Sequence, residues 1–390
     1  MNIPKHYCIM PFVSVRVEDD KNKDSMGIRP CCHFKTSSES DIKFTSIDEY
    51  LNSDFLQNLQ EQFLEGTELP KGCEVCKRAE DMARPSIRTL KFKFFDKQVE
   101  TKTNIRELDL LPSNTCNLTC YMCAPKFSSS VGAEYKKLGW IDSIHNFDHT
   151  DLVCDSIERF TNLDHISIAG GELFYLKNST RLLKTLVNSG AKKVKIFTNA
   201  TILKPEHIEL LQKIPVLDMH LSIDATGELY EFIRYPAKWE TVKLNLHIIK
   251  ESFTTANLRL VPVIGPINIF GIFDLIKLSQ ELEIPLVTSD IITDFYSWNI
   301  LTDQEKESVK NFILSNIKTN NLTDYQKVSL MSYVVGALRT IEFDPIARQT
   351  AVVNLATMCR NRKLTATSLK KVFQGLPDLG QEIIDLGNIA

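Results

Sequence analysis

Residues 116–123 read Cys-Asn-Leu-Thr-Cys-Tyr-Met-Cys, so that Cys116, Cys120 and Cys123 follow a C-x3-C-x2-C pattern. An apolar run at 105–111 precedes this stretch and predicts a strand that leads towards it. Three thiolates can hold three corners of a four-iron, four-sulfur cube, whereas a usual cluster site supplies four. The remaining iron is then free to bind a small molecule. The alternative is a structural zinc site, but zinc favours paired C-x2-C units and four protein ligands.

The length of 390 residues predicts two or three domains, and 43% hydrophobic residues allow a large core. The net charge of -3 gives no electrostatic reason for binding nucleic acid or an anionic membrane surface. We find no apolar signal segment of the usual kind, and the most apolar run, 260–273, is interrupted and too short to span a bilayer. We therefore expect a cytoplasmic protein with no membrane partner, in which ten cysteines indicate metal binding or catalysis rather than disulfides.

The N-terminal region, 1–103, is predicted to be one unit because of its cysteines. The alternating run 12–17 predicts a strand, 28–32 the returning arm of a hairpin, and 47–63 a helix. Four thiolates in this region could hold either zinc or an iron–sulfur cluster. They belong to Cys8, Cys73, Cys76 and either Cys31 or Cys32.

The middle region, 104–299, repeats a strand-then-helix pattern. Six such units argue for parallel strands with right-handed crossovers, short of the eight units of a closed barrel. We predict an α/β fold built as a partial (β/α)6 barrel, open on one side, followed by a mostly helical region at 300–390 with no assignable motif. The expected strands are 105–111, 165–169, 194–198, 219–223, 258–264 and 285–288. The expected C-terminal helices are 303–317, 326–341 and 369–374.

Polar or glycine-rich motifs follow three of the predicted strands, at the ends where parallel α/β proteins bind ligands. Paired glycines allow a ligand to approach the backbone, and exposed peptide groups can bind an ammonium or carboxylate group. Hydroxyl, amide and carboxylate side chains can bond a polar ligand. An ordinary turn is the alternative for the paired glycines. The candidate ligand-binding residues are Gly170, Gly171, Glu172, Thr198, Asn199, Ser222 and Asp224.

The cysteine spacing resembles that of the radical S-adenosylmethionine (SAM) enzymes. The resemblance implies that these cysteines hold a [4Fe-4S] cluster whose open iron is chelated by SAM. Residues 170–173 resemble the family's Gly-Gly-Glu-Pro motif, with Leu173 in place of proline. Residues 198–200 resemble Thr-Asn-Gly and 222–225 resemble Ser-Φ-Asp-Gly, each with alanine for the final glycine. Arg234 could pair with the SAM carboxylate, or could form only a surface salt bridge.

The N-terminal cysteines resemble the SPASM and twitch modules of the same family, which carry auxiliary clusters. Here the module precedes the barrel, as in the N-terminal-twitch branch, which also has proline and a serine run after the third cysteine. The resemblance implies a second [4Fe-4S] cluster held by Cys8, Cys31, Cys73 and Cys76. The sequence Ile-Arg-Pro-Cys at 28–31 matches the family's hydrophobic-x-Pro-Cys and favours Cys31 as ligand. The spacing of the cysteines from Gly27 favours Cys32 as the ligand instead.

The resemblance implies an enzyme that cleaves SAM reductively and uses the 5′-deoxyadenosyl radical to abstract hydrogen from an unidentified substrate. A peptide is one candidate substrate, and a nucleoside, sugar or small metabolite is the alternative. A flavodoxin- or ferredoxin-type protein is the expected reductant. Nucleic acid as substrate is disfavoured because the chain has no net basic charge. A hypothesis from another functional class is that the chain is a non-catalytic zinc or iron–sulfur protein that acts in binding or electron transfer.

Two cysteines remain outside these sets. Cys154 lies in a helical pattern and is expected to be a buried small hydrophobe. Cys359 lies close to Arg360 and Arg362, a setting that could lower its pKa, but we expect a structural role.

Overall fold

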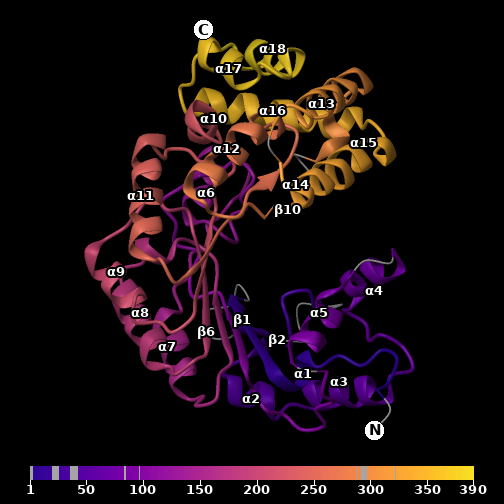
Figure 1. The fold of residues 1–390 in the computed structure, drawn as a ribbon, viewed down its shortest axis with the longest axis vertical. Helices are drawn as coiled ribbons and strands as arrows, with labels where there is room; N and C mark the ends of the chain where they lie inside the picture. Colours follow the sequence, from indigo (N-terminus) through magenta and orange to yellow (C-terminus); the bar gives the residue numbers. More distant parts are fainter. Residues whose placement is uncertain are drawn as a thin grey trace. The chain divides into compact units, whose positions relative to one another are not determined.

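The computed structural model describes residues 3–19, 26–35, 43–82, 85–95, 97–287, 289–290, 297–320 and 322–390 (Figure 1). The chain divides into two compact units. The first comprises Met1–Thr115, His145–Phe197 and Lys204–Asp218, and the second Cys116–Ile144, Thr198–Leu203 and Met219–Ala390. These units are composed differently from the predicted regions 1–103, 104–299 and 300–390, which stay a prediction. Most of the segment 18–24, which joins the two predicted arms of the N-terminal hairpin, lies outside the described residues, as does Thr288 of the predicted strand 285–288.

Strands of the first unit follow the order β3-β2-β1-β4-β5-β6. The predicted N-terminal hairpin is confirmed, because β1 and β2 pair antiparallel with Arg16 opposite Arg29. Strand β1 also pairs with β4, and β4, β5 and β6 pair with one another, all in parallel. The bounds are β1 Ser14–Asp19, β2 Met26–Arg29, β3 Lys43–Phe44, β4 Glu107–Leu110, β5 His165–Ile168 and β6 Lys193–Thr198. Parallel strands joined through helices confirm the predicted α/β class.

Helices α7, α8 and α9 pack beside one another in the first unit (Figure 1). Two predictions are wrong near the N-terminus. Positions 12 and 13 belong to helix α1 rather than a strand, since Pro11 has the fixed backbone angle that suits a first helical turn. The predicted helix 47–63 is two helices, because Ser53 caps a new one by accepting a hydrogen bond from Leu56 N. The bounds are α1 Met10–Val13, α2 Ile47–Leu51, α3 Asp54–Glu65, α4 Glu74–Asp81, α5 Ile87–Phe94, α7 Thr150–Glu158, α8 Ser179–Asn188 and α9 Pro205–Leu211.

The second unit contains the remaining strands, with the end of β7 (Leu217–Leu221) next to β8 (Asn257–Leu260). The predicted strand 258–264 is interrupted at Pro262, which has no N–H to donate, and resumes as β9 (Val263–Ile264). The predicted strand 285–288 is reduced to an isolated bridge at Leu286, and β10 is Ser289–Asp290, parallel to β9. Helices of this part are α6 Ser129–Lys137, α10 Gly227–Ile233, α11 Trp239–Ser252 and α12 Ile272–Leu282.

The C-terminal region is helical, as predicted. The predicted helix 326–341 is interrupted by a π-helical stretch at Leu330–Val335. Helices α16 and α18 were not predicted and pack against each other (Figure 1). The bounds are α13 Asp303–Asn316, α14 Asp324–Ser329, α15 Gly336–Thr340, α16 Pro345–Asn361, α17 Ala366–Val372 and α18 Pro377–Gly387. Within the described part of the chain, none of the helices is long and apolar enough to cross a membrane.

Candidate functional site

The cysteine loop, residues 116–123, lies in the second unit and is fixed by backbone hydrogen bonds although it has no regular structure. Thr119 N donates to Tyr235 O at 2.7 Å, and Tyr121 N donates to Ile233 O at 3.1 Å. The loop is therefore bonded to the last residue of α10 and to the segment that follows this helix. These bonds hold the backbone on both sides of Cys120.

The serine run at 128–130 holds the same loop from its other side. Ser128 Oγ donates to Leu118 O at 2.8 Å, and it also caps α6 by accepting from Val131 N. Ser129 Oγ accepts a hydrogen bond from Cys116 N at 3.2 Å. Ser130 Oγ donates to Cys116 O at 2.6 Å. The serine run thus fixes both backbone polar groups of the first cysteine.

Asn199, predicted to touch the ligand, bonds to the cysteine loop. Its Nδ2 donates to Asn117 Oδ1 at 3.0 Å, while its Oδ1 accepts from Thr201 N at 3.0 Å. Thr198 Oγ1 accepts from Ala200 N, which closes the turn after β6. Ala200 has a left-handed backbone, with φ of 56°. Glycine adopts this conformation more readily than alanine, which explains why the Thr-Asn-Gly motif that residues 198–200 resemble ends in glycine. The described left-handed residues do not include Ala225.

The three thiols of the loop have the chemistry that a cluster requires. Cys116 and Cys120 are buried and Cys123 is half-buried. Burial raises the pKa of the Cys120 thiol to about 11, while the guanidinium of Arg234 lowers it. Burial also raises the pKa of Cys123. Since metal ligation requires the thiolate, cluster binding would release these protons, and a buried cation would favour the charged form. The donor set therefore fits a cluster.

Arg234 lies beside the cysteine loop and is already paired. Its Nε donates to Asp224 Oδ2 at 2.6 Å, and its Nη1 lies 3.8 Å from Cys120 Sγ. Asp224 Oδ1 also accepts from Val263 N at 2.8 Å, which fixes the carboxylate at the end of β7. Both side chains are buried, so the alternative of a surface salt bridge is wrong. Ser222 N donates to Thr198 O at 2.9 Å. Contact of any of these residues with SAM stays a prediction.

The Gly170-Gly171-Glu172 turn belongs to the first unit. Both glycines have positive φ, 85° and 55°, and a Cβ atom at Gly171 would lie 2.4 Å from Thr115 O. Glu172 N donates to that same carbonyl at 2.9 Å. Its buried carboxylate accepts from Phe174 N at 3.2 Å. Glycine is thus required here by close backbone packing as well as by conformation.

The N-terminal cysteines gather in the first unit. Cys8 and Cys31 are buried in one apolar cluster, and Cys73 packs against it. Cys76 is buried, whereas Cys32 is exposed. Burial, together with the charge of neighbouring thiols, raises the pKa of Cys31 and of Cys73 to about 12.

The placement of Cys31 and Cys32 corrects one expectation. Strand β2 ends at Arg29, so the prediction that the returning strand reaches position 32 is wrong. Both cysteines follow the strand, in a turn where Phe34 N donates to Cys31 O and Lys35 N donates to Gly72 O. The second bond brings this turn to the Cys73 segment. Among the described residues, no three His, Cys, Asp or Glu are placed to hold a single metal ion.

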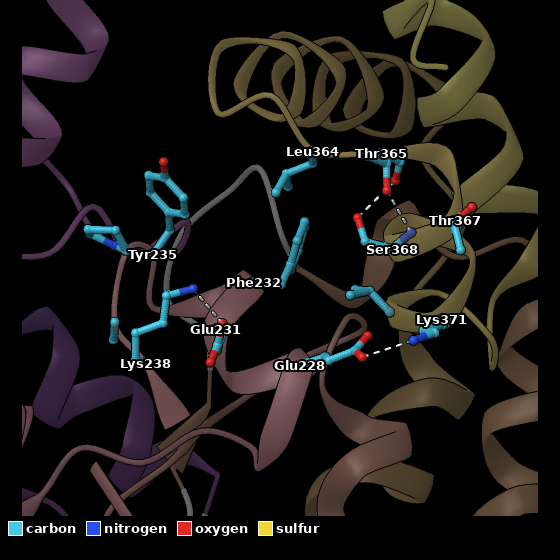
Figure 2. Close-up of a pocket in the computed structure, with 13 residues that line it drawn as sticks. Glu228, Glu231, Phe232, Tyr235, Lys238, Leu364, Thr365, Thr367, Ser368 and Lys371 are labelled. Atoms are coloured by element: carbon cyan, nitrogen blue, oxygen red, sulfur yellow. Dashed lines mark hydrogen bonds and ion pairs between the residues drawn. The ribbon is translucent and has the colours of Figure 1, made fainter. Parts of the chain in front are cut away.

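A pocket of about 490 Å³ lies beside the segment that is bonded to the cysteine loop. Figure 2 shows Phe232 and Tyr235 on one side and Leu364 and Thr365, from the C-terminal region, on another. Ion pairs join Glu228 to Lys371 and Glu231 to Lys238, so these four charges are balanced (Figure 2). No sequence motif indicated this pocket, because its walls lie at 228–238 and 364–372, far apart along the chain.

Comparison with known proteins identifies the class. Residues 110–276 match the model of the Radical SAM superfamily. The match includes all three cysteines of the loop and agrees with what their spacing predicted, and the matched family implies a [4Fe-4S] cluster and SAM.

Individual relatives are distant. GTP 3′,8-cyclase of Synechocystis sp. is 24% identical over 200 residues, which are 50% of this chain and 56% of the cyclase. The chain thus matches about half the length of that relative. Among solved structures, Streptococcus suis SuiB bound to precursor peptide SuiA has a TM-score of 0.40 at 14% identity, covering 64% of this chain and 60% of SuiB. SuiB bound to SAM has a TM-score of 0.37 at 16% identity, covering 68% and 61%.

Proposed function

We propose that the protein is a radical SAM enzyme that cleaves SAM reductively and abstracts hydrogen from its substrate. This proposal rests mainly on the cysteine loop, which lies inside the region that matches the superfamily. Cys116, Cys120 and Cys123 would hold the cluster. When bound, the cluster supplies the electron that breaks a carbon–sulfur bond of SAM and yields the 5′-deoxyadenosyl radical.

Side chains of the protein hold this loop in place and provide a positive charge beside its thiols. Arg234 provides a buried positive charge beside Cys120, and Asp224 fixes its orientation. Asn199 joins the end of β6 to the loop through Asn117. On the resemblance of their motifs, Gly170, Gly171 and Glu172 bind the SAM amino group, and Thr198 and Ser222 bond its polar groups. The C-terminal ends of the strands are the general position for such ligands.

A second [4Fe-4S] cluster is proposed for the N-terminal region, held by Cys8, Cys31, Cys73 and Cys76. Burial of Cys31 and exposure of Cys32 support the choice between them. A flavodoxin- or ferredoxin-type protein would deliver the electron, in a cytoplasmic setting. The regions 1–103, 104–299 and 300–390 are proposed as the functional modules.

The substrate is proposed only as a class. A peptide is the first candidate, and a nucleoside, sugar or small metabolite is the alternative. The name of the Synechocystis relative states that it acts on GTP, which supports the small-molecule alternative.

SAM cleavage by anaerobically reconstituted protein tests this function. With dithionite or reduced flavodoxin, the wild type should form 5′-deoxyadenosine, whereas C116A, C120A and C123A should each form none. Cys154→Ala is the control, because this thiol is also buried but lies in α7 rather than in the cysteine loop. Undiminished 5′-deoxyadenosine formation by C120A would exclude the proposed function.

A further inference from the structure

Arg362, at the C-terminal end of α16, makes contacts that no sequence motif indicated. Its Nε and Nη2 donate to the two carboxylate oxygens of Glu134, at 2.9 and 2.7 Å. Its Nη2 also donates to the backbone oxygen of Thr119, in the cysteine loop. The guanidinium lies over the ring of Tyr235, with its central carbon 4.9 Å from the ring centre. One buried side chain thus contacts the cysteine loop, α6 and the segment after α10.

Helix α6 and the segment after α10 are also the parts of the chain that hold the cysteine loop. Thr119 directly precedes Cys120, and its N–H is already bonded to Tyr235 O. The contact with Arg362 satisfies its carbonyl as well, so both backbone polar groups of Thr119 are held. Glu134 lies in α6, where Ser129 and Ser130 bond the backbone of Cys116. Asn361 Nδ2 donates to Glu134 Oε1 at 3.2 Å and reinforces the pair.

We propose that Arg362 and Glu134 are positioning residues that hold the cysteine loop in its cluster-binding conformation, an inference that rests on the proposed function of that loop. The C-terminal region thereby contributes to the cofactor site. The planar guanidinium is suited to this role, because it can bond a carboxylate with two donors and still reach a carbonyl. A lysine at this position would keep the charge but not the fork.

The chain offers a matched control in Arg348, which lies in α16, the helix that Arg362 directly follows. Its guanidinium is similarly buried and donates to Glu305 at 2.6 and 3.1 Å and to Glu382 at 2.8 Å. It also donates to a backbone carbonyl, Ile300 O, at 2.9 Å. The two arginines therefore share burial, carboxylate pairing and a carbonyl bond, but only Arg362 bonds the cysteine loop.

Hydrogen exchange of the full-length apo protein tests the proposal. In R362M, the amides of residues 117–123 should exchange about tenfold to a hundredfold faster than in the wild type, as expected for losing a hydrogen bond to a charged group. In R348M, exchange in this loop should equal that of the wild type. If R362M does not fold, R362K serves, and its loop should also exchange faster. After anaerobic reconstitution, R362M should hold less iron and show an altered electron spin resonance signal, whereas R348M should do neither.

Loop exchange in R362M equal to the wild type, or raised equally in R348M, would overturn the proposal. Because exchange is measured without a cluster, this result is independent of the function proposed above. A wild type that binds iron and cleaves SAM, together with an unaffected loop in R362M, would refute the role of Arg362 alone. A wild type that binds no iron would refute the proposed function instead.

Discussion

Asn199 Nδ2 donates a hydrogen bond to Asn117 Oδ1, 3.0 Å away, and so joins the end of β6 to the cysteine loop. Asn117 in turn donates from Nδ2 to Thr201 Oγ1 at 2.9 Å. The two amides and the hydroxyl form a closed set of bonds beside Cys116. A residue that the family resemblance assigned to SAM is therefore bonded to the cysteine loop.

Asn199→Ala should therefore lower the free energy of unfolding of the apo protein and also weaken SAM binding. The substitution leaves Asn117 Oδ1 and Thr201 N without these partners. A fully buried polar group left unpaired costs roughly 1–3 kcal/mol, and both residues are half-buried, so we expect a loss near the lower end of that range. Urea unfolding should show this loss, and the iron bound per chain after reconstitution should fall. The exposed Asn162→Ala is the control and should change neither quantity. Weaker SAM binding with unchanged stability and iron content would show that Asn199 is a ligand contact only.

Ala200→Gly and Ala225→Gly should change the free energy of unfolding by different amounts or in opposite directions. The left-handed backbone at Ala200 costs an L-residue roughly 1–2 kcal/mol, which glycine avoids. Glycine also gains about 0.4–1 kcal/mol of entropy when unfolded, so A200G should be neutral or slightly stabilised. Ala225 lacks this conformation, and A225G should lose roughly 0.5–1 kcal/mol. Equal losses in urea unfolding would contradict the assigned backbone strain.

The buried thiol of Cys359 should cause the free energy of unfolding to decrease above pH 9. Burial raises the pKa of its thiol from 9.0 to about 12, so the proximity of arginine does not make it reactive. Between these values the unfolded chain has lost a proton that the folded chain retains, and the free energy of unfolding decreases as pH rises. One thiol contributes about 1.4 kcal/mol per pH unit in this window. Cys359→Ala should have a pH slope smaller by that amount, and an unchanged slope would contradict the burial effect.

The auxiliary site should distinguish Cys31 from Cys32. In a variant with alanine at Cys116, Cys120 and Cys123, about four irons should remain, as in a four-iron cluster. Adding C31A should remove them, because that thiol lies with Cys8 in the buried cluster. Adding C32A should leave them, because this side chain is exposed. Zinc in place of iron in the triple variant would refute the auxiliary cluster while leaving the SAM site untouched.

Local patterns predicted the parts of the site that local physics determines. The cysteine spacing, the Gly170-Gly171 turn and the βα order follow from chemistry within a few residues, and the structure or the family match supports each. The helix at Pro11, the π-helical stretch and α16 depend on capping and packing, which periodicity does not register.

The pairs that hold the loop could not be predicted. Arg362 and Glu134 are 228 positions apart, and neither belongs to a motif. Arg234 and Asp224 are ten positions apart, but the resemblance assigned both to the ligand rather than to each other. Such pairing depends on the tertiary fold, since a buried charge requires a partner that the sequence does not specify.

The central claim is that Cys116, Cys120 and Cys123 hold a cluster with one iron open to SAM. Electron spin resonance of reduced protein tests it most directly, in a variant with alanine at Cys8, Cys31, Cys73 and Cys76, which retains only this cluster. We expect the signal to shift when SAM is added and to be absent when Cys120 is also replaced by alanine. A signal that is unchanged by saturating SAM would contradict an open iron at this loop.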